Sequence, residues 1–303
     1  MACLEGRPLP CRRSGDQSKG LVWQPEGVNA IEPSPPPGDA RRVSFFITCM
    51  VDVFAPDVGE AAVRMLRESG CEVSCPLGQT CCGQPAWNSG FAADAARVAR
   101  TSLDALEADG ADAVVVPAGS CATMIKVFWP ELFELAGDHD ASARAQRLGA
   151  KTFELTSFLD ARPSPNRVDQ SAAAHRGPTI AYHHSCHMLR ELRIHDAPLA
   201  LLERAGCTIA EWPDGDRCCG FGGLFSVKLP ETSVAMAEAK LASLPAEVEM
   251  VVGSDSSCLM HLAGRAKTEG RTIAFRHTAE VIASAATTGG AIPRAAIARK
   301  GQA

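Results

Sequence analysis

Four of the thirteen cysteines recur at one fixed spacing, and this repeat constrains the fold more than any other feature of the sequence. Each of the four has a counterpart 137 positions later, and both sets have the order Cys, Cys-Cys-Gly, Cys. The two sets are Cys49, Cys81, Cys82 and Cys121, and Cys186, Cys218, Cys219 and Cys258. A match at four positions indicates an internal duplication, so both halves are expected to fold in the same way.

The segments between the cysteines repeat as well. Each half opens with an apolar run typical of a strand, at 43–48 and 179–184, which leads to the first cysteine. Helix-like and strand-like patterns then alternate, and a further strand and helix close each half at 152–159 and 272–283. This alternation predicts an α/β fold in which two parallel α/β units pack as a pseudo-symmetric pair.

The composition sets the expected boundaries of these units. Residues 1–42 hold seven prolines and few periodic apolar positions, which predicts a disordered N-terminal tail. The polar stretch 161–178 is the expected linker, and the Ala/Gly-rich stretch 284–303 is expected to be a loose C-terminal tail. The two cysteine-rich units are therefore predicted at 43–160 and 179–283.

Charge and hydropathy exclude several classes of function. Thirty basic and thirty-five acidic side chains give a net charge of -5, which argues against nucleic-acid binding. No apolar run approaches the roughly 20 residues of a membrane-spanning helix, and the N-terminal segment lacks the apolar stretch of a signal peptide. A cytoplasmic protein is expected, and in that reducing compartment a cysteine-rich chain favours metal or redox chemistry over disulfides.

The predicted topology brings the four cysteines of each half together. Ligands of parallel α/β sheets bind beyond the carboxyl ends of the strands, and each cysteine of a set follows one of three strands. Two adjacent cysteines face opposite sides of an extended chain, so they reach one centre only where the backbone turns. Gly83 and Gly220 permit that turn. A helix beginning shortly afterwards would direct N–H groups to the sulfurs and favour thiolates.

Four thiolates in each half are the ligand set of an iron-sulfur cluster, which tolerates widely spaced ligands and an adjacent pair. Structural zinc sites typically use Cys-x2-4-Cys pairs, and no Cys-x-x-Cys occurs in the sequence. Zinc, and cysteines that are simply buried or disulfide-bonded, remain the alternatives.

Several other residues near the repeated cysteines are candidates for lesser roles. A histidine beside Cys186 is a candidate donor to a ligand sulfur, and the alternative is that it satisfies loop backbone or faces water. The histidines in question are His183, His184 and His187. Aromatic residues beside the Cys-Cys-Gly segments are expected to pack over the site, namely Trp87, Phe221 and Phe225. The cations Lys228 and Arg190 are weaker candidates for binding a carboxylate, and their alternative is solvation.

The remaining cysteines are not expected to be ligands. Cys71 and Cys207 share a Gly-Cys context and are predicted to be core sulfurs, and Cys75 also lies outside the matched sets. Cys3 and Cys11 fall in the predicted tail.

The segments around the cysteines resemble those of the lactate utilization protein A family. The resemblance rests on 81–90 (CCGQPAWNSG), 218–228 (CCGFGGLFSVK), 184–188 (HSCHM) and 258–260 (CLM), and it covers about 43–283. The same Cys-Cys-Gly domains occur in heterodisulfide reductase and in the iron-sulfur subunits of glycolate oxidase and anaerobic glycerol-3-phosphate dehydrogenase.

This resemblance implies an iron-sulfur electron-transfer subunit of an L-lactate-oxidising complex, with two [4Fe-4S] clusters held by the eight repeated cysteines. It also implies two partner subunits, one with ferredoxin-type clusters, and a small 2-hydroxy acid as the substrate of the complex. Glycolate, glycerol-3-phosphate or a heterodisulfide is the alternative substrate. A zinc-stapled or thiol-based scaffold without a redox cofactor is the alternative from another class.

The chain departs from the broader Cys-Cys-Gly pattern at one point. That pattern ends with two cysteines, whereas each half here has one in its last segment. The positions available for a second ligand hold Gly119, Met124, Asp255, Ser256 and His261. Four ligands per cluster are therefore expected, with His261 as a candidate fifth ligand in the second half.

The sequence assigns no catalytic residue to this chain. A G-x-G-x-x-G fingerprint for a flavin or nicotinamide is absent, and so is a ferredoxin cysteine run. Lactate oxidation moves two electrons, whereas iron-sulfur centres normally pass electrons singly. Either a partner carries the two-electron cofactor or a cluster in this chain binds substrate directly, and the sequence leaves both open.

Overall fold

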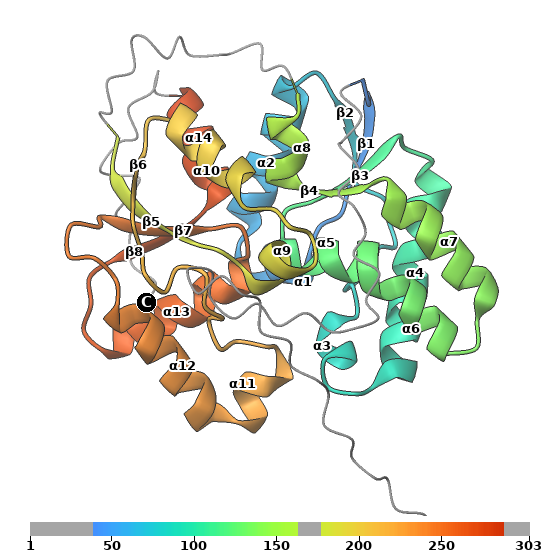
Figure 1. Ribbon diagram of the computed structural model, residues 1–303. Helices are drawn as coiled ribbons and strands as arrows, with labels where there is room; N and C mark the ends of the chain where they lie inside the picture. Colours follow the sequence, from blue (N-terminus) through green and yellow to red (C-terminus); the bar gives the residue numbers. More distant parts are fainter. Residues whose placement is uncertain (1–38, 163–176, 288–303) are drawn as a thin grey trace, which may run out of the picture. The chain divides into compact units, whose positions relative to one another are not determined.

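The computed structural model describes residues 39–162 and 177–287, which all belong to one compact unit. It contains two four-stranded sheets whose paired strands are all parallel (Figure 1). The first sheet holds β1 (Arg42–Phe45), β2 (Glu72–Ser74), β3 (Ala113–Val116) and β4 (Thr152–Glu154). The second holds β5 (Thr179–His183), β6 (Thr208–Ala210), β7 (Met250–Gly253) and β8 (Ala274–His277). The predicted α/β fold with two parallel units is confirmed.

Both sheets have the same strand order, β2-β1-β3-β4 and β6-β5-β7-β8. In the first sheet, Val43 of β1 is in register with Val73 on one side and with Ala113 on the other. The chain therefore leaves the first strand of each sheet towards one edge and later crosses to the other side. The carboxyl end of that strand is the point where the strand order reverses, which is where such sheets bind ligands.

Helices connect the strands in both halves. The first half holds α1 (Cys49–Phe54), α2 (Pro56–Glu68), α3 (Gln84–Trp87), α4 (Ala92–Asp109), α5 (Gly119–Thr123), the π-helix η1 (Met124–Phe128), α6 (Trp129–Leu135), α7 (His139–Ala150) and α8 (Leu155–Asp160). The second half holds α9 (Cys186–Arg190), α10 (Asp196–Arg204), α11 (Leu224–Lys228), α12 (Pro230–Ala242), α13 (Ser256–Thr268) and α14 (Thr278–Thr287). Within the described ranges, no helix has the length and apolar character needed to span a membrane.

Helix α2 illustrates how the local sequence sets an element and its packing. Pro56 occupies its first turn, where the missing N–H is not needed for an intrahelical bond. Its buried residues recur at helical spacing and form one face against the sheet, namely Val58, Ala61, Ala62, Met65 and Leu66. After the helix the chain turns at Gly70, whose φ of 85° favours glycine, and enters β2.

The Gly-Cys dipeptides after α2 and α10 have the same role in both halves. Gly70 and Gly206 both have positive φ values, 85° and 88°. The cysteines that follow them, Cys71 and Cys207, are buried in hydrophobic clusters, as predicted for core sulfurs. Cys75 is exposed.

The last helix of each half packs against the other half. Helix α14 of the second half contacts α2 of the first, and α8 of the first half contacts α10 of the second (Figure 1). Ala279 and Ala283 of α14 are part of a hydrophobic cluster made mainly by first-half residues. Val281 and Ala285, on the opposite side of the same helix, belong to a cluster of the second half. The two units thus share their cores through these helices.

The structure differs from the predicted element pattern in three places. The sequence pattern places a loop of small residues between the third strand and the last cysteine of each half, but Cys121 lies within α5 and Cys258 within α13. The first half inserts η1, α6 and α7 between Cys121 and β4, whereas the second half passes directly from α13 to β8. Helix α14 continues to Thr287, past the predicted start of the C-terminal tail at position 284.

The remaining boundary predictions concern segments outside the described residues. These are most of the predicted N-terminal tail (1–38), most of the predicted linker (163–176) and the end of the predicted C-terminal tail (288–303). They stay predictions. Strand β1 begins at Arg42, one residue before the predicted start of the first unit.

Candidate metal centres

The structure brings the four repeated cysteines of the first half together beyond its sheet. Cys49 begins α1 after β1, Cys81 and Cys82 follow β2, and Cys121 lies in α5 after β3. The Sγ atoms of Cys49 and Cys81 are 3.7 Å apart, and those of Cys82 and Cys121 are 3.3 Å apart. All four sulfurs therefore surround one position at the carboxyl edge of the sheet. We call them the first quartet.

Hydrogen bonds favour a thiolate at one position of the first quartet. The pKa of Cys81 is lowered to about 3, because the thiols of Cys49 and Cys82 donate hydrogen bonds to its sulfur. The backbone N–H of Gly83 lies 3.5 Å from the same sulfur and adds a further donor. The pKa of Cys49 is raised, because its thiol donates to Cys81 and because it is partly buried. A soft metal bound by these sulfurs would take the place of the protons that the thiols share in hydrogen bonds.

The second quartet repeats this arrangement. Cys186 begins α9, Cys218 and Cys219 follow β6, and Cys258 lies in α13. The pKa of Cys218 is lowered to about 2, because Cys186 and Cys219 donate hydrogen bonds to its sulfur. Cys219 also shares a hydrogen bond with Cys258, so the four sulfurs again form one group. Within the described residues, every cysteine is a free thiol.

The two glycines of the Cys-Cys-Gly segments make the predicted turns. Gly83 and Gly220 both have a φ of 88°, which favours glycine. A Cβ atom at Gly83 would lie 2.9 Å from the carbonyl oxygen of Ala95, and one at Gly220 would lie 2.6 Å from that of Ser233. The turns direct backbone N–H groups to the sulfurs, since the N–H of Gly220 lies 3.4 Å from Cys218 Sγ. Both positions thus require glycine, because the positive φ disfavours other residues and because a Cβ atom would come too close to a carbonyl oxygen.

His183 is the one predicted histidine that faces the sulfurs. It ends β5, is completely buried, and neither ring nitrogen has a hydrogen-bond partner within the described residues. One ring nitrogen and the Sγ atoms of Cys219 and Cys258 all lie within 4.8 Å of one another. Burial and nearby positive charge, first of all burial, lower its pKa well below the usual range, so the ring is neutral. A neutral imidazole offers one N–H donor and one acceptor.

The other two histidines have partners elsewhere. His184 stacks on His195 with 4.5 Å between ring centroids, and burial lowers the pKa of His184 to about 4. His187 Nδ1 lies 3.0 Å from a carboxylate oxygen of Glu191. His184 and His187 thus fit the alternative interpretation, in which such a histidine has a local structural role.

The side chains at three positions where the sequence allows an additional ligand have different surroundings. Met124 is completely buried in the hydrophobic core of the first half. His261 Nε2 lies 3.2 Å from Ser233 Oγ, and this hydroxyl donates to the carbonyl oxygen of Gly220. Ser256 Oγ is buried and has no hydrogen-bond partner within the described residues. The structure thus engages His261 in a hydrogen bond that supports the Cys-Cys-Gly turn.

Asp255 connects the surroundings of the two quartets. Its carboxylate accepts hydrogen bonds from the N–H (2.9 Å) and the hydroxyl (3.1 Å) of Ser120, which precedes Cys121 in the other half. A third hydrogen bond comes from Ser257 Oγ at 2.9 Å. Asp255 is only 2% exposed, so this is a buried polar link between the two halves.

Lys240 is a functional candidate that the sequence reasoning missed. Its ammonium group is completely buried, donates to the carbonyl oxygens of Asp214 and Arg217, and lies 4.4 Å from the centre of the Trp212 ring. Burial lowers its pKa to about 8, while the nearby Cys219 sulfur favours the charged form. A signal was available, because the repeat places Lys240 opposite an apolar residue of the first half.

The aromatic residues beside the quartets mostly pack as predicted. Phe221 packs against the hydrophobic cluster that contains Cys219 and Cys258. Trp87 packs against the cluster that contains Cys82 and Cys121. Phe225, in α11, instead lies close to Gly222, which precedes this helix.

The two cations proposed for carboxylate binding lie apart from the sulfurs' immediate contacts. Lys228 Nζ lies 5.6 Å from the centre of the Phe91 ring, and Arg190 is exposed at the end of α9. Of the other cysteines, Cys3 and Cys11 lie outside the described residues.

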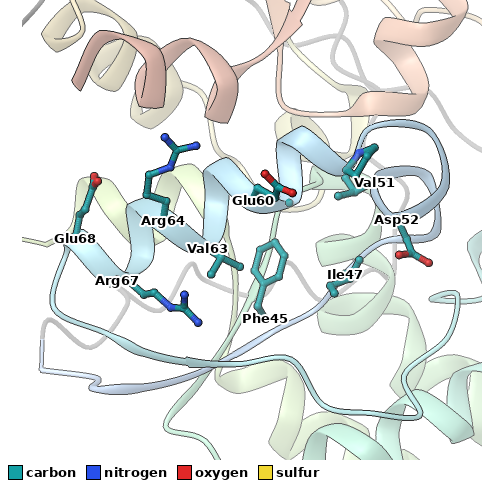
Figure 2. Close-up of a pocket in the computed structure, with 11 residues that line it drawn as sticks. Phe45, Ile47, Val51, Asp52, Glu60, Val63, Arg64, Arg67 and Glu68 are labelled. Atoms are coloured by element: carbon teal, nitrogen blue, oxygen red, sulfur yellow. The ribbon is translucent and has the colours of Figure 1, made fainter. Parts of the chain in front are cut away.

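A surface pocket of about 520 Å³ lies along α2 and is separate from both quartets (Figure 2). Apolar side chains such as Phe45, Ile47 and Val63 line it, together with charged side chains that include Arg64 and Arg67. None of the eight repeated cysteines is among its lining residues. The pocket therefore adds no ligand to either centre.

Comparison with known proteins gives the same division into two repeated domains. The cysteine-rich CCG domain matches residues 43–126 and 180–263, and each range contains one quartet. Lactate utilization protein A of Geobacillus kaustophilus is 43% identical over 243 residues, covering 80% of this chain and 98% of that protein. This chain belongs to the lactate utilization protein A family.

Alignments with other members of the family cover the same share of the chain. Lactate utilization protein A of Shouchella clausii is 43% identical over 249 residues, and that of Bacillus velezensis is 41% identical over 245 residues. Each alignment covers 80% of this chain and 99% of the relative. The similarity therefore spans both cysteine-rich domains of the lactate utilization protein A fold rather than one of them.

Proposed function

We propose that this chain is an iron-sulfur electron-transfer subunit of an L-lactate-oxidising complex. The observation that carries the proposal is the pair of equivalent cysteine quartets, each with four sulfurs around one position at the carboxyl edge of a parallel sheet. Four thiolates without oxygen ligands suit a soft metal cluster. The name of its relatives supports lactate as the substrate of the complex.

We assign all eight repeated cysteines as ligands of two [4Fe-4S] clusters. When bound, such clusters supply one-electron transfer. The chain's own contribution is to hold the sulfurs, to exclude water with Phe221 and Trp87, and to offer backbone N–H groups to the sulfurs of Cys81 and Cys218. The sulfur ligands and their burial suit such a cluster, since the side chains of Cys82 and Cys219 are each only 2% exposed.

The two-electron oxidation of lactate requires further components. We infer two partner subunits, one with ferredoxin-type clusters and one of the two able to accept two electrons at once. Growth on L-lactate of a strain that lacks this chain tests the substrate. Normal growth on L-lactate with a defect on glycolate or glycerol-3-phosphate would favour the alternative substrates.

Iron and acid-labile sulfide in the anaerobically purified protein test the cofactor directly. We expect about eight iron and eight sulfide per chain, as two [4Fe-4S] clusters require. Cys82→Ser and Cys219→Ser should each remove about half of the iron, because each takes one thiolate from one quartet. Cys71→Ser is the matched control and should leave the iron content unchanged, since Cys71 is a core sulfur. One zinc per half and no sulfide would instead establish the scaffold alternative.

A further inference from the structure

The two quartets have nearly the same shape but different neighbours. Among the positions where the 137-residue repeat pairs a basic side chain of the second half with an apolar one of the first, three have an apolar residue that is inaccessible to solvent. The pairs are Phe46 and His183, Leu103 and Lys240, and Met124 and His261.

Several other features that influence a bound cluster are similar in both halves. The two most buried sulfurs of each quartet are similarly exposed, because Cys82 and Cys219 are both 2% exposed, while Cys121 and Cys258 are 8% and 9% exposed. One backbone donor is common to both, since the Gly N–H of each Cys-Cys-Gly segment lies 3.4–3.5 Å from the first sulfur of the pair. The second quartet has a further donor, because the N–H of Phe221 lies 3.4 Å from Cys219 Sγ. This additional backbone donor and the different side chains both distinguish the second centre from the first.

His183 makes the most direct difference. Its ring lies against Cys219 and Cys258, and both ring nitrogens are buried without a partner within the described residues. A buried polar group without a hydrogen bond is destabilising, so this ring is suited to a group held between the sulfurs. Phe46, at the corresponding position, packs in the hydrophobic cluster with Cys82 and Cys121 and offers no donor.

Lys240 adds positive charge on the same side. Its ammonium is bound to the carbonyl oxygen of Arg217, the residue before Cys218, at 2.9 Å, and it interacts electrostatically with Cys219 and Cys258. Asp255 opposes this charge, since its carboxylate acts on Cys186 and Cys258. That carboxylate is already bonded to three donors, whereas the N–H of His183 has no other acceptor within the described residues.

We propose that His183, assisted by Lys240, gives the second quartet's cluster a higher reduction potential than the first, so that electrons collect in the second half. Reduction adds negative charge to a cluster already bound by four thiolates. A donor to its sulfurs and a nearby cation stabilise that charge strongly in a buried site. Electrons would then enter at the first quartet and leave from the second. This inference rests on the proposed iron-sulfur function.

A redox titration of the anaerobically purified protein, followed by EPR, tests the inference. Cys219→Ser and Cys82→Ser are used to assign the two signals, because each retains one quartet. In the wild-type chain we expect the midpoint of the second quartet to lie above that of the first. His183→Phe, which introduces the first-half residue, should lower the second midpoint and leave the first unchanged. We expect at least a tenfold change in electron distribution, or about 59 mV for one electron.

Two further variants keep the test decisive. His184→Phe is the matched control, because His184 stacks on His195 away from the sulfurs, and it should move neither midpoint. Phe46→His should raise the midpoint potential of the first quartet. This variant still tests the effect of the histidine if His183→Phe loses iron from the second quartet. Equal midpoints in a protein with full iron and sulfide, or no shift in either substituted quartet, would overturn the inference alone. Absence of iron and sulfide from the wild-type chain would instead overturn the proposed function.

Discussion

Glu154, at the junction of β4 and α8, is a carboxyl group that the fold removes from water. It is 1% exposed, one oxygen accepts hydrogen bonds from the backbone N–H groups of Thr156 and Ser157, and the other has no partner within the described residues. Burial raises its pKa to about 7, and the hydrogen bonds only partly oppose this. The folded state therefore favours the protonated form.

This shift predicts how stability depends on pH. Because the folded pKa lies above the unfolded value of 4.5, the contribution of Glu154 is present below pH 4.5 and is lost as the pH rises through 7. Glu154→Gln, which imitates the protonated form, should gain about 3 kcal/mol relative to the parent between pH 4.5 and pH 8. Denaturant unfolding at several pH values measures this.

Glu231→Gln is the control for that experiment, because Glu231 is an exposed carboxyl on α12. It should leave the pH dependence of the unfolding free energy unchanged. A parallel pH dependence for Glu154→Gln and the parent would mean that Glu154 does not hold a proton in the folded protein.

At the scale of elements, α14 joins the cores of both halves and should be sensitive to added volume. Ala283 lies on the side of α14 that packs with first-half residues and is 5% exposed. Ala283→Leu should destabilise the protein by about 1–3 kcal/mol, because extra methylene groups do not fit a packed core. Ala286→Leu, at an exposed position of the same helix, should change the free energy of unfolding by less than about 0.5 kcal/mol. Equal effects of the two substitutions in denaturant unfolding would contradict the shared packing.

The same scale shows which elements the sequence can predict. The repeat and the alternation of patterns predicted the first and last strands of both halves near their observed positions. The insertion of α6 and α7 was not predicted, since it has no counterpart in the second half. The packing of α14 on α2 was also missed, because a short apolar helix carries no signal of which half it joins.

Some features of the two candidate sites could likewise be predicted from the sequence, and others could not. The repeat predicted which sulfurs the structure groups together, and Gly83 and Gly220 make the predicted turns. His183, whose ring lies beside the sulfurs, was one of three neighbouring candidates, and only the structure separates it from His184. Lys240 was missed because a lysine on an amphipathic helix is usually solvated, whereas here it turns inward to two carbonyl oxygens.

At the scale of the whole molecule, polar contacts as well as helices join the two halves. His277 Nε2 donates to the carbonyl oxygen of Pro117 at 3.0 Å, and this histidine is only 1% exposed. Ser120 donates to Asp255, and Arg204 pairs with Asp160. Each contact spans residues of different halves, and the first two lie close to the quartets. Separation of the halves would leave the buried groups of the first two contacts without partners, at a cost of about 1–3 kcal/mol each.

These shared cores and contacts predict that the two halves unfold together. In calorimetry of the reduced, metal-free protein, the calorimetric and van't Hoff enthalpies should agree within error, as for one cooperative unit. Independent halves of similar size would give a calorimetric enthalpy about twice the van't Hoff value. Asp255→Ala leaves the N–H of Ser120 without its buried acceptor, so it should lower the midpoint temperature of that single transition. If it instead split the transition into two, the halves would be held together mainly by this polar link and not by α8 and α14.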